Sequence, residues 1–370
     1  MLEAGPETSV RDFKALVLQS FYEDNLTRRR TVVELLRGSK SLENSVSLSE
    51  SGVSCDTELL VVFSTRSVTC KSQEDAEFHM VSEGDVVLTI PDDASEVAEG
   101  AFADCQKIQS LILNDSITFI GAFAFSRCSG LMDTRIPSSV TAIGEKAFLR
   151  SGLRSLTIPS SVASIGDAAF ALCESLTTLT ICSGVRSIGA RAFNGCSLLD
   201  TLSIPSSVTS MGEFAFGGCF SLTSLTIGGG MTSIAVRAFD GCCELTQITI
   251  PSSVTEIQSG AFQGCMSLTD LTIPSSVTSI EDMAFSGCSA LASLSLPDSV
   301  TSVSRRAFEG CSSLESLHVP AALLGERAFD GCSSLRDLAV PAETSLASCF
   351  AGCPSSCKVV MGEKRSLGPG

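Results

Sequence analysis

The chain has 370 residues, 44% of them hydrophobic and 18% charged, so it can bury an extended core. Its formal net charge of −16 excludes nucleic acid and anionic membrane surfaces as main partners, because phosphate binding needs clustered Lys and Arg. We therefore expect a protein partner that is neutral or basic.

The first 63 residues do not share the repeat that fills most of the chain, and they predict a small α+β unit. Apolar residues recur at helical spacing behind Thr8 and Ser9, either of which can cap a helix. This spacing predicts a helix from about Val10 to Tyr22. Two later runs rich in Val and Leu predict strands, Val32–Arg37 and Leu59–Phe63.

This unit also resembles ubiquitin. The segment LLRGSKSLENSVSLSESGVSCDTELLVV follows the ubiquitin order of a strand, a Gly-Lys turn, a Leu-Glu pair, a Leu and a last strand. Upstream, LEAGPETSVRDFK is similar to the second strand and the start of the helix. The first strand has no counterpart, so the resemblance implies an incomplete ubiquitin-like domain over about residues 1–63, and we expect a truncated N-terminus. No Gly-Gly tail follows Phe63, which excludes conjugation to other proteins.

Partners of ubiquitin relatives contact one apolar residue of the third strand and two of the last strand. Leu36, Leu60 and Val62 take those positions here. Alternation along the last strand assigns Leu59 and Val61 to the core and leaves the other face to the patch. The resemblance implies a binding patch for ubiquitin-receptor proteins. The alternative is that these apolar residues only reflect strand propensity.

Residues 64–85 are polar and predict a linker or an N-terminal cap for the repeats. A cap would cover the core and the strand edge that the first repeat leaves open.

From about residue 86 one unit recurs every 21–23 residues in about twelve copies, and it determines the architecture. In each unit LxxLxI predicts a strand of ~3–5 residues, VxxIG a second extended piece, and AFxGC a single α or 3₁₀ turn. One unit cannot bury its own Leu and Phe, so units must stack. The aligned Phe residues are 102, 125, 148, 170, 193, 216, 239, 262, 285, 308, 329 and 350.

The pattern LxxLxIPxxVxxIGxxAFxGCxxL is similar to the BspA-type leucine-rich repeat, which occurs in bacterial surface proteins and in many protist proteins. The resemblance covers about residues 88–353. It implies a mainly-β, right-handed leucine-rich repeat solenoid over residues 86–353, with a parallel sheet along one face and a length of roughly 60 Å. Residues 354–370 are then a C-terminal cap and tail that contain one last strand.

Eleven of the 17 cysteines occupy one repeat position: 105, 128, 173, 196, 219, 242, 265, 288, 311, 332 and 353. We interpret this ladder as small buried hydrophobes with a weak S–H donor. Stacked side chains point in parallel and rarely meet disulfide geometry, and no CxxC pair or His partner indicates a metal. Reduced thiols predict a reducing compartment.

The chemistry of catalysis needs a base beside a nucleophile, or a metal with open coordination. The chain has only two histidines: His79 lies in the segment before the repeats, and His318 takes a repeat position that Thr or Ser fills elsewhere. We therefore expect no catalytic, metal or cofactor site and no enzymatic activity. The alternative is a hydrolase site built from Ser and His318.

The remaining candidate site is the surface of the sheet. A long parallel sheet is rigid and presents a row of variable side chains, which suits protein binding. The alternative is that its Ser and Thr residues are only strand formers. The candidate residues on this surface are Thr226, Gln247, Thr249, Asp270, Thr272, Ser293, Ser295 and His318.

Together these features predict a monomeric, non-enzymatic scaffold whose solenoid binds a protein while the head recruits ubiquitin-pathway components. The first thirty residues lack the apolar run of a signal peptide, and no run of about 18 apolar residues predicts a membrane span. These observations predict a cytoplasmic or nuclear location. The alternative is a cell-surface adhesin or host-interaction protein, which would need a leader ahead of residue 1.

Overall fold

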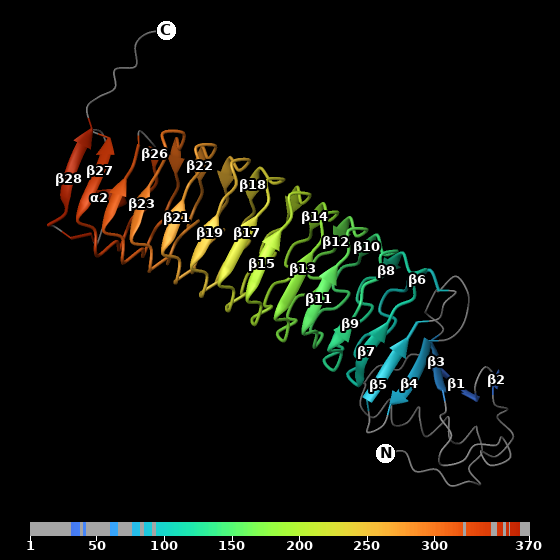
Figure 1. The fold of residues 1–370 in the computed structure, drawn as a ribbon. Coiled ribbons are helices and arrows are strands. Elements are labelled where there is room, and N and C mark those ends of the chain that lie inside the picture. Colours follow the sequence, from blue (N-terminus) through green and yellow to red (C-terminus); the bar gives the residue numbers. More distant parts are fainter. Residues whose placement is uncertain are drawn as a thin grey trace.

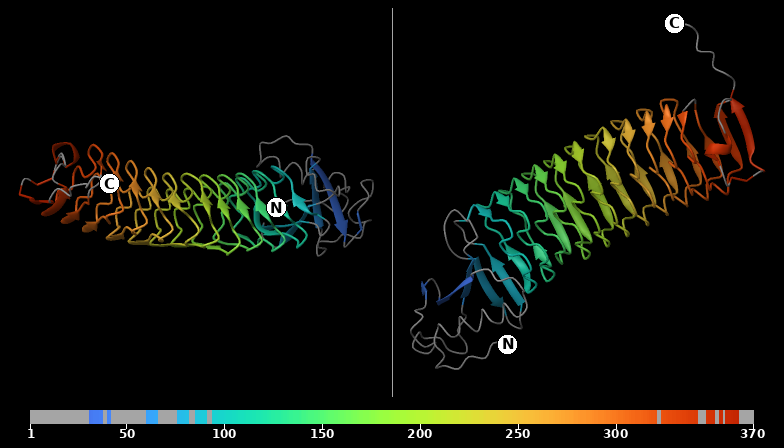
Figure 2. Two further views of the ribbon diagram at one scale, coloured as in Figure 1. Left: turned by 90° about the horizontal axis from the view of Figure 1, so that it is seen from above. Right: turned by 180° about the vertical axis from the view of Figure 1, so that it is seen from behind.

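The computed structural model describes residues 31–37, 40–41, 60–65, 76–81, 85–90, 94–320, 323–341, 346–350, 353–354 and 356–362. The helix predicted from Val10 to Tyr22 lies outside these residues. Figure 1 shows a long, gently curved stack of coils, and Figure 2 shows the same stack from above and from behind.

Every coil contributes one strand to a long parallel face along the stack (Figure 1), on which the strand pairing is interrupted between residues 134 and 155 and between residues 272 and 293. The strands pair in register, so Leu202 lies beside Leu225 and Ile204 beside Ile227. The predicted LxxLxI strand is confirmed, although the second copy is only two residues long. The strands are β7 (Ile108–Ile112), β9 (Asp133–Thr134), β11 (Ser155–Ile158), β13 (Thr178–Ile181), β15 (Thr201–Ile204), β17 (Ser224–Ile227), β19 (Gln247–Thr249), β21 (Asp270–Thr272), β23 (Ser293–Ser295), β25 (Ser316–His318), β27 (Asp337–Pro341) and β28 (Lys358–Gly362).

A second row of two-residue parallel strands forms the other long side of the stack, which confirms the second extended piece. A tight turn separates the two rows in each coil, as where the N–H of Val208 donates to the carbonyl of Pro205 at 3.1 Å. The short strands are β6 (Glu96–Val97), β8 (Phe119–Ile120), β10 (Ala142–Ile143), β12 (Ser164–Ile165), β14 (Ser187–Ile188), β16 (Ser210–Met211), β18 (Ser233–Ile234), β20 (Glu256–Ile257), β22 (Ser279–Ile280), β24 (Ser302–Val303) and β26 (Leu323–Leu324).

The strands that precede the repeats extend the long sheet. They are β1 (Thr31–Arg37), β2 (Lys40–Ser41), β3 (Leu60–Thr65), β4 (Ala76–Val81) and β5 (Asp85–Thr89). β1 and β3 coincide closely with the two strands predicted for the head, and they pair antiparallel. β4 lies in the segment predicted as a linker or cap, where it pairs with β3 and β5. β5 then pairs parallel with β7, so the sheet passes into the repeats without a break.

The core is one continuous column rather than a series of small cores. In each coil the side chains of the repeat face inward, and Leu199, Val208 and Phe216 are fully buried. The twelve Phe rings from Phe102 to Phe350 stack with centroids 5.1–5.8 Å apart. Because each ring contacts rings of the coils before and after it, every coil depends on its neighbours.

The AFxGC segment forms no helical turn, so that prediction was wrong. With the residue before it, the segment forms a run of β-turns with two residues in the left-handed region, such as Phe123 (φ 57°) and Arg127 (φ 61°). Their N–H groups donate to the next coil, to the carbonyls of Glu145 at 2.8 Å and Leu149 at 2.6 Å. In a helix these N–H groups would bond within the segment. Here the turns form a further hydrogen-bond ladder between coils.

The strand predicted after Cys353 is present as β28, which closes the sheet at its C-terminal end. Beside it the last coil contains the four-residue helix α2 (Leu346–Cys349). Among the described residues, no helix has the length and apolar character required to cross a bilayer.

Candidate binding surface

The outer face of the long sheet carries two columns of side chains, because alternate residues of each strand point away from the core. All eight residues that the sequence predicted for this surface lie in these columns and are exposed. In the strand register, Gln247 lies between Ser224 and Asp270, and His318 lies between Ser295 and Ala339. The structure therefore brings the predicted residues onto one continuous face.

Threonines at the margins of the strands have a structural role instead. The hydroxyl of Thr246 donates to the carbonyl of Thr223 at 3.2 Å, and the hydroxyl of Thr278 donates to the carbonyl of Thr255 at 3.2 Å. These bonds join successive coils. Within the part of the chain that the structure describes, the hydroxyls of Thr226, Thr249 and Thr272 make no such bond and remain available to a ligand.

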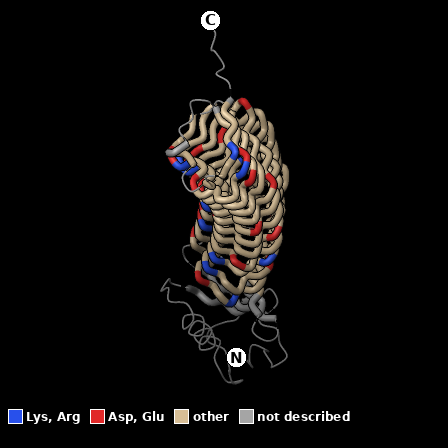
Figure 3. Tube along the Cα trace, turned by 90° about the vertical axis from the view of Figure 1, so that its left-hand side faces the viewer, with Lys and Arg blue, Asp and Glu red and all other residues tan. Residues whose placement is uncertain are grey.

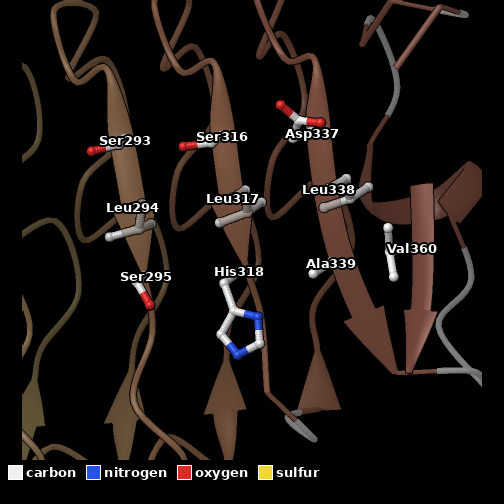
Figure 4. A pocket seen from close by; sticks show the side chains of 10 residues that line it. All are labelled: Ser293, Leu294, Ser295, Ser316, Leu317, His318, Asp337, Leu338, Ala339 and Val360. Carbon is white, nitrogen blue, oxygen red and sulfur yellow. The ribbon is translucent and has the colours of Figure 1, made fainter. Parts of the chain in front are cut away.

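The sheet face is hollowed near its C-terminal end, around the exposed imidazole of His318 (Figure 4). The hollow has a volume of about 260 Å³ and spans β23, β25, β27 and β28. It combines the hydroxyl groups of Ser293 and Ser295, the imidazole, the carboxylate of Asp337 and the apolar side chain of Val360. Such a mixture can accept hydrogen bonds, donate them and bury an apolar group.

The sequence analysis predicted the two serines and His318 but missed Asp337 and Val360. Both residues that the sequence analysis missed continue the outward columns toward the C-terminus. Asp337 pairs with Ser316 and with Lys358, and Val360 pairs with Ala339. The two-residue alternation of the strands extended past His318 was the signal that could have found them.

Positions with Lys or Arg and positions with Asp or Glu are interspersed along the stack (Figure 3). Arg191 pairs with Glu213 of the next coil at 2.9 Å, and Arg336 pairs with Glu315 of the preceding coil at 3.7 Å. Exposed pairs of this kind are worth roughly 0–1 kcal/mol each. They set the local charge of the surface more than its stability.

The cysteine ladder is buried, and it makes the weak S–H bonds that the sequence predicted. The Sγ of Cys219 donates to the carbonyl of Phe193 in the preceding coil at 3.6 Å, and Cys196 does the same to Phe170 at 3.4 Å. In the shortened unit, Ser151 replaces Cys and its hydroxyl donates to the Phe125 carbonyl at 3.2 Å. Each of these carbonyls also accepts the backbone N–H of the ladder residue in its own coil, as the Phe193 carbonyl does from Cys196 at 3.3 Å, so the thiol adds a second hydrogen bond that joins successive coils.

Burial also makes the ladder thiols unreactive, because it disfavours the thiolate. It raises the pKa of Cys173 and of Cys219 to about 12. Cys353 at the C-terminal end differs, since it is half-buried and a hydrogen bond with Cys332 lowers its pKa.

Brief treatment of the folded protein with iodoacetamide at neutral pH is expected to alkylate Cys353 and to leave Cys196 and Cys219 unmodified. Peptide mass spectrometry measures the modified fraction at each position, and treatment in urea provides the fully accessible control. Alkylation of Cys219 at the rate of Cys353 in the folded protein would contradict the buried ladder.

Comparison with known proteins identifies a family whose sequence model matches this chain. The model of the BspA type leucine rich repeat region matches residues 86–199, 141–269 and 255–367, in six copies. No match is found among the curated proteins.

Solved structures with a similar fold include the pneumococcal vaccine antigen PcpA. It is 21% identical, the alignment covers 82% of this chain and 88% of that one, and the TM-score is 0.53. A leucine-rich repeat protein from Bacteroides ovatus is 24% identical over 79% of this chain and 99% of its own, with a TM-score of 0.41. A leucine rich cell surface protein from Faecalibacterium prausnitzii is 25% identical over 80% and 95%, with a TM-score of 0.39.

Proposed function

Because this chain belongs to the BspA-type leucine-rich repeat family, we propose that it is a non-enzymatic scaffold that binds a protein partner on its long sheet. The observation that carries the proposal is the pair of exposed side-chain columns, which the strand register holds at fixed spacing on a rigid backbone. The hollow around His318 is the point on this face where a partner side chain can be partly enclosed.

A photo-crosslinking amino acid at Thr249 tests this use of the sheet. Thr249 is exposed on the sheet face, and Ser252 is exposed on the following turn of the same coil, so Ser252 is the matched control. We expect the label at Thr249 to capture a partner from an extract of the source organism and the label at Ser252 to capture much less. Equal capture at both positions would show that the partner does not bind preferentially on the sheet face.

We also propose that the head recruits ubiquitin-receptor proteins through Leu36, Leu60 and Val62. The backbone register supports this part, since Leu36 pairs with Leu60 and Glu34 with Val62 on neighbouring antiparallel strands. The Leu36→Ala variant is expected to lose most of its recovery by immobilised ubiquitin-receptor domains, because the patch would lose the one apolar side chain that β1 contributes to it. Equal recovery of the variant and the parent chain would leave only the solenoid as a binding module.

A second candidate function is a cell-surface adhesin, since the repeat family occurs in bacterial surface proteins. The free thiols of the ladder favour a reducing compartment instead. Fractionation of the source cells separates the two: recovery in the cytosol supports the scaffold, and recovery at the cell surface supports the adhesin.

A further inference from the structure

The repeat position directly after the ladder Cys departs from its usual polar character in three consecutive coils. In most coils this position is polar, as at Gln106, Glu174 and Ser289. In three consecutive coils it holds Phe220, Cys243 and Met266 instead. Phe220 is 54% exposed and Met266 55% exposed.

These three positions are direct neighbours in space. The N–H of Glu244 donates to the carbonyl of Phe220 at 3.1 Å, and the N–H of Ser267 donates to the carbonyl of Cys243 at 3.0 Å. In the coil before, Leu198 is 51% exposed two residues after the ladder Cys196, and the two segments are joined where the N–H of Ser221 donates to the carbonyl of Ser197 at 3.1 Å. We call these four residues, Leu198, Phe220, Cys243 and Met266, the edge patch.

The floor of the edge patch is a column of glycines. The ring of Phe220 comes within 3.9 Å of the point where a Cβ of Gly218 would lie, and within 3.7 Å of that point at Gly241. One side of the ring therefore lies along the glycine backbone. This leaves a shallow surface that can receive side chains of another protein.

The fold itself does not require apolar side chains at these positions. Further along the stack the same backbone bond is made behind a serine, where the N–H of Ser313 donates to the carbonyl of Ser289 at 3.1 Å. Coils with a polar residue at this position therefore form the same backbone hydrogen bond as coils with an apolar one. Because a contiguous group of exposed apolar residues is unfavourable in water, a function in binding accounts for it better than packing does.

The surroundings of the edge patch are acidic. Glu244 directly follows Cys243, and its N–H donates to the carbonyl of Phe220 at 3.1 Å. The carbonyl of Asp240 accepts the N–H of Gly218, beneath the Phe220 ring, at 2.7 Å. Arg237 pairs with Asp240 at 3.7 Å, and a further carboxylate, Asp200, lies two residues after Leu198. A second copy of this acidic chain would repel the patch, and so would an anionic lipid surface.

We propose that the edge patch binds a protein segment in which apolar side chains alternate with or are flanked by Lys and Arg. The apolar side chains would cover Phe220 and Met266, and the basic groups would pair with Glu244 and Asp240. This site lies on the turns beside the sheet, so it goes beyond the proposed use of the sheet face and can hold even if that use is wrong.

Peptide display on the full chain tests this proposal with a random peptide library as the probe. We expect the selected peptides to be rich in apolar and basic residues, and their affinity to fall at least about tenfold in F220S/M266S. Other coils carry Ser at this position, so the double variant is expected to keep the fold, and its thermal unfolding checks this. A peptide with its Lys and Arg replaced by Glu is expected to lose binding.

Two control variants make the result specific. Leu323→Ser changes an apolar residue of the short strand β26 that is 80% exposed, and Ser295→Ala with His318→Ala changes the hollow of the sheet face. Both are expected to retain peptide binding. Selected peptides that are acidic, or that bind F220S/M266S as tightly as the parent chain, would overturn the proposal. Self-association of the parent chain that F220S/M266S abolishes would also overturn it.

Discussion

Replacing Phe193 by Ala is expected to lower the free energy of unfolding by about 3–5 kcal/mol. The side chain is fully buried, and its ring stacks on Phe170 at 5.2 Å and on Phe216 at 5.1 Å. The substitution removes apolar contacts and leaves a cavity inside the column that connects successive coils. Rigid hydrogen-bond ladders on both sides prevent the coil from collapsing onto the cavity.

Urea unfolding followed by circular dichroism measures this loss. Phe220→Ala is the matched control, because it makes the same chemical change one coil later on the surface, where we expect a change within about ±0.5 kcal/mol. Equal effects of the two substitutions would show that the Phe column does not hold the coils together.

Raising the pH above 9 is expected to unfold the solenoid, with a midpoint near pH 10. The ordinary pKa of a thiol is 9.0, and burial raises the pKa of Cys105, Cys173, Cys219 and Cys311 to about 12. It also raises the pKa of five more ladder thiols well above 9.0: Cys128, Cys196, Cys242, Cys265 and Cys288.

Stability falls with rising pH because, between pH 9 and 12, the thiolate forms only in the unfolded chain. Below pH 9 the thiols are protonated in both states, so their contribution to stability is constant. As the pH rises toward 12, the unfolded chain loses protons that the folded chain retains, and stability falls. Nine such groups give a limiting slope of about 12 kcal/mol per pH unit, against a total stability of about 5–15 kcal/mol.

Circular dichroism across this pH range, under reducing conditions, checks the alkaline transition. Cys242→Ser is the control, because serine does not ionise there and Ser151 already occupies one rung. It is expected to reduce the number of protons released on unfolding by one. A solenoid that stays folded at pH 11 would contradict the account of the ladder as a buried column of thiols.

The repeat of Leu, Ile and Phe was enough to predict stacked units, because one unit cannot bury these side chains alone, and the resemblance to the BspA-type repeat implied the solenoid with its parallel sheet. It also identified the outward positions, since alternation along a strand follows directly from the inward Leu202 and Ile204. The β-turns of the AFxGC segment were not predicted. In most coils one of the two left-handed residues is the Gly of this motif, such as Gly195 (φ 74°), but the other is usually not a glycine, as with Phe123 (φ 57°), and hydrogen bonds to the next coil stabilise both.

The candidate sites were predicted less well than the fold. A hollow depends on how side chains of different coils lie together, so the role of Asp337 and Val360 beside His318 became visible only in the structure. The sequence analysis did not predict the edge patch, although its four residues can be read from the sequence. Phe220 and Met266 look unremarkable within single repeats, and only their stacking in consecutive coils makes them a surface.

A double-mutant cycle between Phe193 and Phe216 tests most directly whether neighbouring coils stabilise each other through one shared core. Their rings stack at 5.1 Å, and we predict a coupling free energy of about 0.5–1.5 kcal/mol between the two Ala substitutions. The pair Phe193 and Phe262, three coils apart, is predicted to be additive within about 0.5 kcal/mol. Additivity of the neighbouring pair would contradict the continuous core.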